Sequence, residues 1–248
     1  MIRAFRFLAS VTFLTLWHGG RILWHALRGR RHVPGGLYDR INRAWAGGMM
    51  RWNRVAATVD GLERLPPGQP CVYVANHFSF IDIWVLLERL PGSVRFVYKK
   101  ELGRIPVFGP AMRASGHIAI DRRNRGAAFA AYDVAAVQVR EGTSAMVFAE
   151  GTRSRDGRLL PFKKGPFVLA IAAGVPVVPV AILGAFEAMP KGSIAPRRVP
   201  VVVRIGQPIA TEGLDYSDRD RISDQCRAAI IVMGAGAAQE GESPRAGG

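Results

Sequence analysis

The stretch CVYVANHFSFIDIWVLLERL, residues 71–90, combines a strand pattern, a polar turn and a helix pattern. The apolar run at 71–75 predicts a buried strand, and the apolar residues over 80–90 recur at the period of a helix. His77 lies between the two, and Asp82 follows it by five positions. With 5 His and 10 Asp in 248 residues, such a pair is expected by chance about 0.2 times, so the rest of the chain must supply the other parts of a site.

The alternation of strand and helix patterns continues along the chain. It predicts an α/β fold with a mainly parallel central sheet flanked by helices. The predicted bounds are 59–232 for this α/β domain and 233–248 for a Gly-rich, polar tail that is expected to be disordered. Further strands are predicted at 93–98, 117–120, 145–149, 175–183 and 199–206, and helices at 105–115, 126–142, 166–174 and about 215–232.

Residues 1–58 carry a different pattern. The apolar run at 7–17 is shorter than the ~20 residues needed to span a bilayer, and no small-x-small cleavage site follows it. Residues 38–59 place apolar and aromatic residues at spacings of three and four with arginines between them, which predicts an amphipathic helix. Residues 1–60 hold ten Arg, two Asp and neither Lys nor Glu. The segment is therefore predicted to be a membrane-associated helical pair; the alternative is a pair packed into the core of the domain.

The charge balance is strongly basic. The chain has 29 Arg, 5 Lys and a formal net charge of +15, and 49% of its residues are hydrophobic, which is enough for a large core. The planar fork of arginine suits phosphate, so acidic partners are expected: nucleic acid, an anionic membrane or a phosphorylated substrate. A general bias toward arginine is the other explanation. Because Arg and Trp occur together in the amphipathic N-terminal segment, the pattern favours a membrane surface over nucleic acid.

Several common chemistries have no motif in this chain. Cys71 and Cys226 lie far apart and form no CxxC, which argues against a disulfide framework and against a zinc site, so no metal is expected. The sequence contains neither the nucleotide loop GxxxxGK(S/T) nor a GxSxG nucleophile elbow.

Polar clusters follow three of the predicted strands at the point where each strand ends. Asn76 and His77 follow the strand at 71–75, Lys99 and Lys100 follow the strand at 93–98, and the tetrapeptide Glu-Gly-Thr-Arg follows the strand at 145–149. In α/β sheets, ligands bind at the carboxyl ends of the strands. The three clusters are therefore expected to converge on one site.

Four motifs in this order resemble those of the glycerolipid acyltransferase family. They are NHFSFID at 76–82, KKELGRIPVFG at 99–109 with AIDR at 119–122, FAEGTRS at 148–154, and GVPVVPVAI at 174–182. The resemblance covers about residues 55–210. It departs from the family pattern at Ala149, where the family usually has Pro, which changes the stiffness of the backbone and removes no reacting group.

The resemblance implies that His77 is a general base and that Asp82 orients it. A hydroxyl is a poor nucleophile at neutral pH, and a neutral imidazole is suited to remove its proton. Five residues on a regular helix turn through about 500°, so the two side chains can pair only if His77 stands in the loop before the helix. Asn76 and Ser79 are candidates to cap that helix, and its first backbone amides are candidates to bind the oxyanion. Ser79 is also the rival nucleophile, although no elbow motif surrounds it.

The remaining candidate residues concern substrate binding. By resemblance, Glu150, Gly151, Thr152 and Arg153 hold the phosphate of the acceptor, and Lys99 adds positive charge. A guanidinium offers phosphate a bidentate contact, and a glycine lets the backbone approach closely. Since Glu150 is anionic, it is expected to orient Arg153 or to contact a hydroxyl.

The resemblance implies transfer of a fatty acyl chain from acyl-CoA or acyl carrier protein to the free hydroxyl of lysophosphatidic acid, giving phosphatidic acid. No cofactor beyond this thioester co-substrate is expected. The expected partners are the membrane lipid bilayer, a lysophospholipid acceptor and acyl carrier protein, and the expected location is the cytoplasmic face of the cell's inner membrane. Another lysolipid such as lyso-ornithine lipid, or glycerol 3-phosphate, is an alternative acceptor, and a lipid carrier without catalysis is an alternative function.

Overall fold

The computed structural model describes residues 1–236. The predicted disordered tail lies outside the described residues from 237 onward. Residues 233–236 form a turn in which Ala235 is buried, so ordered structure extends past the predicted boundary at 232.

Within the described residues the chain forms one seven-stranded sheet in the order β1-β7-β6-β2-β5-β3-β4. All neighbouring strands are parallel except β6 and β7, which are antiparallel. The predicted α/β fold with a mainly parallel sheet is therefore confirmed. The strands are β1 Ala57–Asp60, β2 Val72–Ala75, β3 Val94–Lys99, β4 Ile118–Ile120, β5 Ser144–Phe148, β6 Val177–Leu183 and β7 Val201–Ile205.

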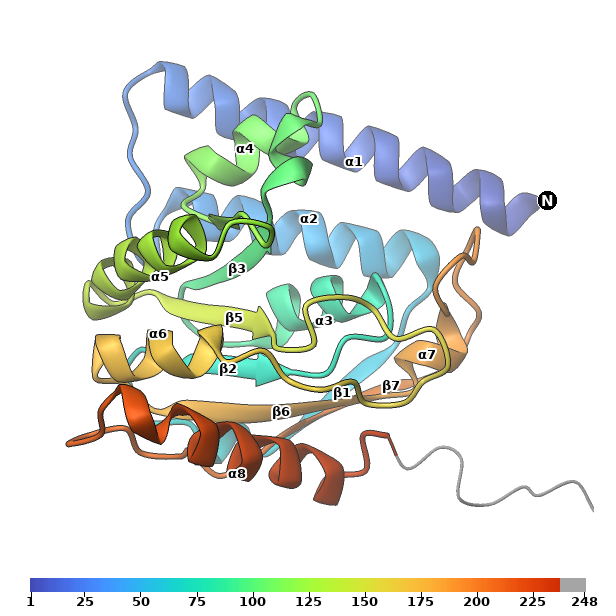
Figure 1. Ribbon diagram of the computed structural model, residues 1–248. Helices are drawn as coiled ribbons and strands as arrows, with labels where there is room; N and C mark the ends of the chain where they lie inside the picture. The colour runs from blue at the N-terminus through green and yellow to red at the C-terminus, as the bar shows by residue number, and fades with distance from the viewer. Residues whose placement is uncertain (237–248) are drawn as a thin grey trace, which may run out of the picture.

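Helices cover both faces of the sheet (Figure 1). α5, α6 and α8 lie in front of it, α3 lies behind it, and α1 runs along the top beside α2. The helices are α1 Ile2–Leu27, α2 Leu37–Asn53, α3 Ile81–Arg89, α4 Phe108–Ala114, α5 Arg125–Arg140, α6 Gly165–Ala173, α7 Ala185–Ala188 and α8 Arg219–Val232, with short 3-10 helices at Leu62–Arg64, Lys100–Arg104 and Tyr216–Asp218.

The central strand β2 shows why the strands of this sheet appear in the sequence as continuous apolar runs. Tyr73 and Ala75 belong to the core on the α3 side, while Val72 and Val74 belong to the core on the α6 side. Successive side chains of a strand point to opposite faces, and here both faces are buried, so no polar residue alternates with the apolar ones.

The N-terminal segment is more closely joined to the domain than its pattern predicts. α2 buries Ala46 and Met49 in the core on the α3 side. The helix predicted to reach residue 59 ends at Asn53, and Ala57–Asp60 instead forms strand β1, which pairs with β7. The predicted domain boundary after residue 58 therefore falls inside a strand. Among the described residues, no helix is both long enough and apolar enough to cross a membrane.

Candidate active site

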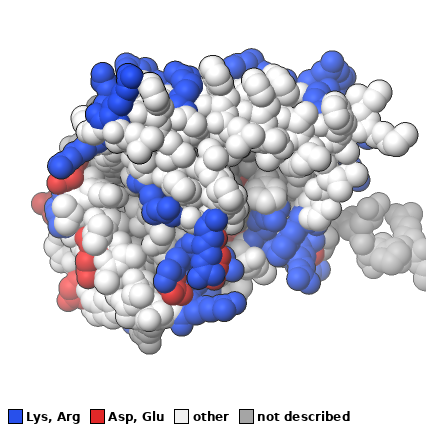
Figure 2. Space-filling view, turned by 90° about the horizontal axis from the view of Figure 1, so that it is seen from above, with Lys and Arg blue, Asp and Glu red and all other residues white. Residues whose placement is uncertain are grey.

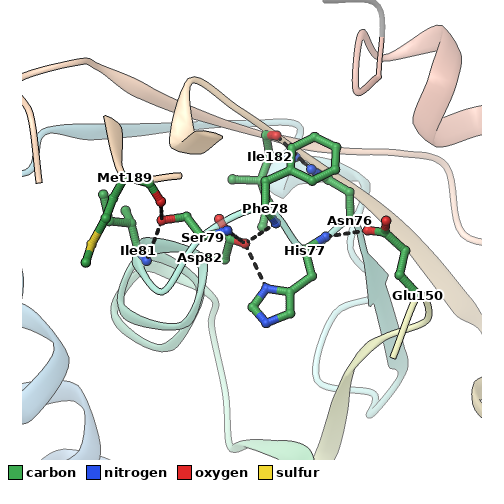
Figure 3. Close-up of polar contacts among 9 residues, drawn as sticks. All are labelled: Asn76, His77, Phe78, Ser79, Ile81, Asp82, Glu150, Ile182 and Met189. Atoms are coloured by element: carbon green, nitrogen blue, oxygen red, sulfur yellow. Dashed lines mark hydrogen bonds and ion pairs between the residues drawn. The ribbon is translucent and has the colours of Figure 1, made fainter. Parts of the chain in front are cut away.

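The loop after β2 brings His77 and Asp82 together. β2 ends at Ala75 and α3 begins at Ile81, so His77 stands in the loop before the helix, as the pairing requires. The Nδ1 atom of His77 lies 2.9 Å from Oδ2 of Asp82 (Figure 3). This is hydrogen-bond distance for a ring N–H that donates to a carboxylate.

The Asp82 side chain is held in place by the loop just before its own helix. It is fully buried, and its Oδ2 accepts hydrogen bonds from the backbone N–H groups of Phe78 and Ser79, both at 2.8 Å. A carboxylate in the first turn of a helix is also favoured by the helix dipole. Because the Phe78 and Ser79 amides are used by Asp82, they are not free to bind the oxyanion.

The imidazole of His77 is fixed by stacking as well as by hydrogen bonding. Its ring lies against the ring of Phe148 with centroids 3.8 Å apart and planes 11° from parallel. Its side chain is 14% exposed, and Nε2 lies on the far side of the ring from Asp82 (Figure 3). With the proton on Nδ1, Nε2 has a free lone pair, which is the form that a general base needs. Phe148 opens the FAEGTRS motif, but an apolar residue at the end of a predicted strand gives no sign of this contact.

The 150–154 loop holds the backbone of His77 from both sides. Oε1 of Glu150 accepts from the His77 N–H at 2.6 Å, and the His77 carbonyl accepts from the Ser154 N–H at 2.9 Å. The other carboxylate oxygen of Glu150 accepts from the Leu160 N–H at 2.8 Å. Glu150 was expected to orient Arg153 or to contact a hydroxyl; instead, both of its oxygens bind backbone amides, and it acts on His77 through the main chain.

The environment of Glu150 changes its ionisation. Burial raises the pKa of its carboxyl group to about 7, the nearby charge of Asp82 adds to this, and the two backbone N–H donors oppose it. A carboxyl group that is only 3% exposed loses most of its hydration, which disfavours the charged form. The clamp on His77 is therefore a group that titrates near neutral pH.

Replacing Glu150 with glutamine is expected to lower turnover about tenfold, because the carboxamide has one accepting oxygen for two N–H donors. The folded-state pKa of Glu150 lies above its ordinary value of 4.5, so the stability it contributes is present below pH 4.5 and is lost as the pH rises through about 7. Between pH 5 and pH 8 the unfolding free energy of the wild type should therefore fall by about 2 kcal/mol relative to Glu150→Gln. Urea unfolding at both pH values measures this; parallel pH profiles would contradict the account.

Arg153 lies on the same side of the loop as the dyad. Its guanidinium carbon is 3.8 Å from the centre of the Phe80 ring, at the start of α3. Burial lowers the pKa of Arg153, while the negative charge of Asp82 raises it. A half-buried guanidinium stacked on an aromatic ring is oriented in advance for an anionic ligand.

The other predicted binding residues have different surroundings. Lys99 is 46% exposed at its side chain and pairs with Glu101 at 3.5 Å. Gly151 adopts a left-handed backbone conformation with φ 72°, and it lines a neighbouring cavity together with Thr152. The structure thus brings together His77, Asp82, Glu150 and Arg153, and it gives Lys99, Gly151 and Thr152 other surroundings.

Ser79 and Asn76 serve as structural supports of the loop. Oγ of Ser79 is buried, donates to the carbonyl of Met189 at 2.8 Å and accepts from the Ile81 N–H at 3.2 Å. Its hydroxyl therefore supports the loop before α3, whose N-cap position is Phe80, and its partners do not include the imidazole. The Asn76 side chain was a candidate cap, but it bonds both the N–H and the carbonyl of Ile182, at 2.7 and 2.9 Å, which ties the loop to β6.

An α/β sheet that carries this histidine and aspartate after a central strand, with an EGTR loop beside them, is the architecture of an acyltransferase. The sequence profile of the family described as Acyltransferase matches residues 56–183, and the chain belongs to this family.

Individual relatives agree with this assignment. The chain is 45% identical over 165 residues to a chloroplastic 1-acyl-sn-glycerol-3-phosphate acyltransferase of Brassica napus, a match that covers 63% of this chain and 48% of the relative. It is 34% identical over 180 residues to the human 1-acyl-sn-glycerol-3-phosphate acyltransferase alpha, covering 72% of this chain and 64% of the relative. The chain thus spans about half to two thirds of the length of these relatives.

A solved structure extends the likeness to almost the whole fold. The crystal structure of the 1-acyl-sn-glycerophosphate (LPA) acyltransferase from Thermotoga maritima superimposes with a TM-score of 0.73 and 26% sequence identity. The match covers 94% of this chain and 95% of that one, so it includes the N-terminal helices.

Proposed function

We propose that this chain transfers a fatty acyl group from an acyl thioester to the free hydroxyl of lysophosphatidic acid, giving phosphatidic acid. The observation that carries the proposal is the 2.9 Å contact between His77 Nδ1 and Asp82, which leaves Nε2 on the accessible side of the ring. The names of the relatives and the nearly full-length match to an LPA acyltransferase of known structure support lysophosphatidic acid as the acceptor.

The reaction is a direct displacement in which His77 carries one proton. Nε2 takes the proton of the acceptor hydroxyl while the oxygen attacks the thioester carbonyl, and the carbonyl becomes a tetrahedral oxyanion. Asp82 stabilises the imidazolium through Nδ1–H. When the carbonyl re-forms, the C–S bond breaks, and the leaving thiolate takes the proton from the imidazolium. The products are the ester and a free thiol.

Arg153 is proposed to bind the phosphate of the acceptor, and Lys99 to add positive charge at the rim. The test is an acceptor panel of lysophosphatidic acid, lyso-ornithine lipid and glycerol 3-phosphate, each supplied with acyl-CoA and with acyl carrier protein thioester. Lysophosphatidic acid is expected to be used at least about tenfold better than either rival, and Arg153→Gln should raise its KM about tenfold. A preference for the phosphate-free lipid would refute this acceptor.

The outer face of α1 is proposed to lie in a membrane interface. Its exposed side chains include Phe5, Leu8, Trp17 and Trp24, and their number is unusual for a helix that faces only water. Figure 2 looks down on this side and shows a broad uncharged surface bordered by Lys and Arg. Such a surface suits an anionic leaflet. The cytoplasmic leaflet is proposed, because a CoA or carrier-protein thioester is too polar to cross the bilayer.

Replacing Phe5, Trp17 and Trp24 together with serine is expected to weaken binding to anionic vesicles about 100-fold or more, since each ring loses its burial in lipid. Co-sedimentation with vesicles measures this. The control is Val134→Ser with Val137→Ser, which removes exposed apolar residues from α5 and should leave binding unchanged. Deleting residues 1–58 is a poorer test, because it also removes Met49 from the core. Equal binding by the α1 variant would place the lipid contact elsewhere.

A further inference from the structure

A second recess lies on the other side of the 150–152 loop from the dyad. It is a cavity of about 640 Å³ between the carboxyl ends of β3, β4 and β5, the N-terminal half of α5 and the starts of α6 and α8. The acyl transfer proposed above assigns no substrate to this cavity. Its volume falls within the range of sites that hold small molecules and cofactors.

The cavity has an apolar floor and a cationic mouth. Val97, Ile120 and Val147 contribute to the floor, at the ends of three neighbouring strands. The mouth carries Arg122, Arg123, Lys163, Lys164 and Arg219, against the carboxyl groups of Asp220 and Glu150. A ligand that fits must therefore combine an apolar or neutral stem with an anionic group.

The cations at the mouth differ in how far they are already engaged. Lys164 pairs with Asp220 at 3.0 Å, Arg219 pairs with the same carboxylate at 3.3 Å, and Arg122 donates to the Gly151 carbonyl. In the part of the chain that the structure describes, the side chains of Lys163 and Arg123 are exposed and form no salt bridge, although the charge of Arg123 acts on Glu101. These two are the groups best placed to bind an anion.

The cavity reaches the imidazole through shared residues. Phe148 borders the cavity, while its ring packs in the core on the α3 side and stacks on His77. Glu150 also lines the cavity and accepts from the His77 N–H. A ligand that fills the cavity therefore ends at the carboxyl end of β5, and its reactive end would pass over this strand end to reach the imidazole on the α3 side.

The position of the cavity indicates which of the two substrates, the lipid acceptor or the thioester donor, it can bind. α1 runs along the top of the molecule with Leu14 in the core on the α3 side, whereas α5 and α6 lie in front of the sheet (Figure 1), and the lipid acceptor is proposed to arrive from α1. The acceptor phosphate is assigned to Arg153, which stacks on Phe80 at the start of α3. The cavity between α5, α6 and α8 is thus left for a water-soluble substrate.

We infer that this cavity binds the phosphopantetheine arm of the acyl thioester donor, with the phosphate at Lys163 and Arg123 and the thioester end passing over the carboxyl end of β5 beside Glu150. The arm has an amide and hydrocarbon stem that suits the floor and a phosphate that suits the mouth. It is common to CoA and to acyl carrier protein, so either donor would use the same contacts. The inference rests on the proposed function for its choice of ligand, but the binding itself can be tested without turnover.

The first arm of the test is binding to the full chain. CoA and 4′-phosphopantetheine are each titrated calorimetrically into the wild type, into Lys163→Ala with Arg123→Ala, and into the control Arg89→Ala, whose cation lies at the far end of α3 beside Glu88. The double variant should bind both ligands about tenfold more weakly or worse, and the control should match the wild type within about twofold. Unchanged binding by the double variant would overturn the assignment.

The second arm is kinetic. The double variant should raise KM for acyl-CoA about tenfold while KM for lysophosphatidic acid and kcat stay within about twofold. Acyl-CoA turnover should be inhibited by carrier protein that bears the arm and not by carrier protein without it. Equal inhibition by both forms, or a rise in KM for the lipid alone, would overturn the assignment. If no phosphatidic acid forms but CoA binding still depends on Lys163 and Arg123, the proposed function fails and the cavity assignment stands.

Discussion

Replacing His77 with alanine is expected to lower the rate of phosphatidic acid formation by about 10³-fold or more. The substitution removes the group that takes the proton from the acceptor hydroxyl, and general-base catalysis contributes about 10²–10⁴-fold to such reactions. The loss should appear in kcat, because the residues proposed to bind the substrates are untouched. Release of free thiol and formation of phosphatidic acid are both measured in anionic vesicles.

The matched control for this variant is Ser79→Ala. Its hydroxyl is two residues away but is bonded to Met189 and Ile81, so the variant should lose about 1 kcal/mol of stability and keep turnover within about threefold. Thermal unfolding shows whether both variants fold. Retained turnover in His77→Ala together with lost turnover in Ser79→Ala would make the serine the reacting group.

Replacing Asp82 with asparagine is expected to lower turnover by about 10²–10⁴-fold with a folded protein. The amide oxygen can still accept from the N–H groups of Phe78 and Ser79, but the amide cannot stabilise an imidazolium at Nδ1 as a carboxylate does. Its NH₂ group would meet a buried environment in which Oδ1 has no hydrogen-bond partner among the described residues, costing about 1–3 kcal/mol of stability.

The control for Asp82→Asn is Asp121→Asn. Asp121 is also a carboxylate near the carboxyl end of a strand, but it pairs with Lys100 at 3.4 Å, so turnover should stay within about threefold. Equal losses in the two variants would mean that the general field of the sheet edge, and not the contact with His77, supports catalysis.

The pairing of His77 with Asp82 is predictable because it is local. The two residues are five apart, and the rule that a helix must begin after the histidine follows from helix geometry alone. The alternation of strands and helices is equally local, so the parallel sheet and the convergence of loops at its carboxyl edge are predictable as well.

The supports of the dyad are not predictable, because they connect distant parts of the chain. Asn76 bonds to Ile182, which is 106 residues away, and Glu150 bonds to His77 across 73 residues. From the sequence alone, Asn76 is predicted to cap the helix and Glu150 to orient Arg153 or contact a hydroxyl, since those are the roles that local chemistry offers. Which backbone amide each side chain reaches depends on the order of strands in the sheet.

The prediction that the second N-terminal helix reaches residue 59 is wrong for a related reason. Residues 54–60 have too few positions for the helical and the alternating pattern to be told apart. The pairing with β7, at the register Ala57 to Val201, makes them a strand. Because this partner strand lies about 140 residues further along the chain, the sequence of residues 54–60 does not indicate the pairing.

Thiol release in the absence of an acceptor tests the central claim most directly. The claim is that His77 acts as a base on the lipid hydroxyl, so that the thioester is attacked only by the acceptor. The purified chain is mixed with acyl-CoA alone, released thiol is counted, and the intact protein is weighed by mass spectrometry; lysophosphatidic acid is then added. The account predicts an unmodified protein and no thiol until the acceptor is present. A burst of thiol equal to the amount of enzyme, with one acyl group added to the protein, would contradict it.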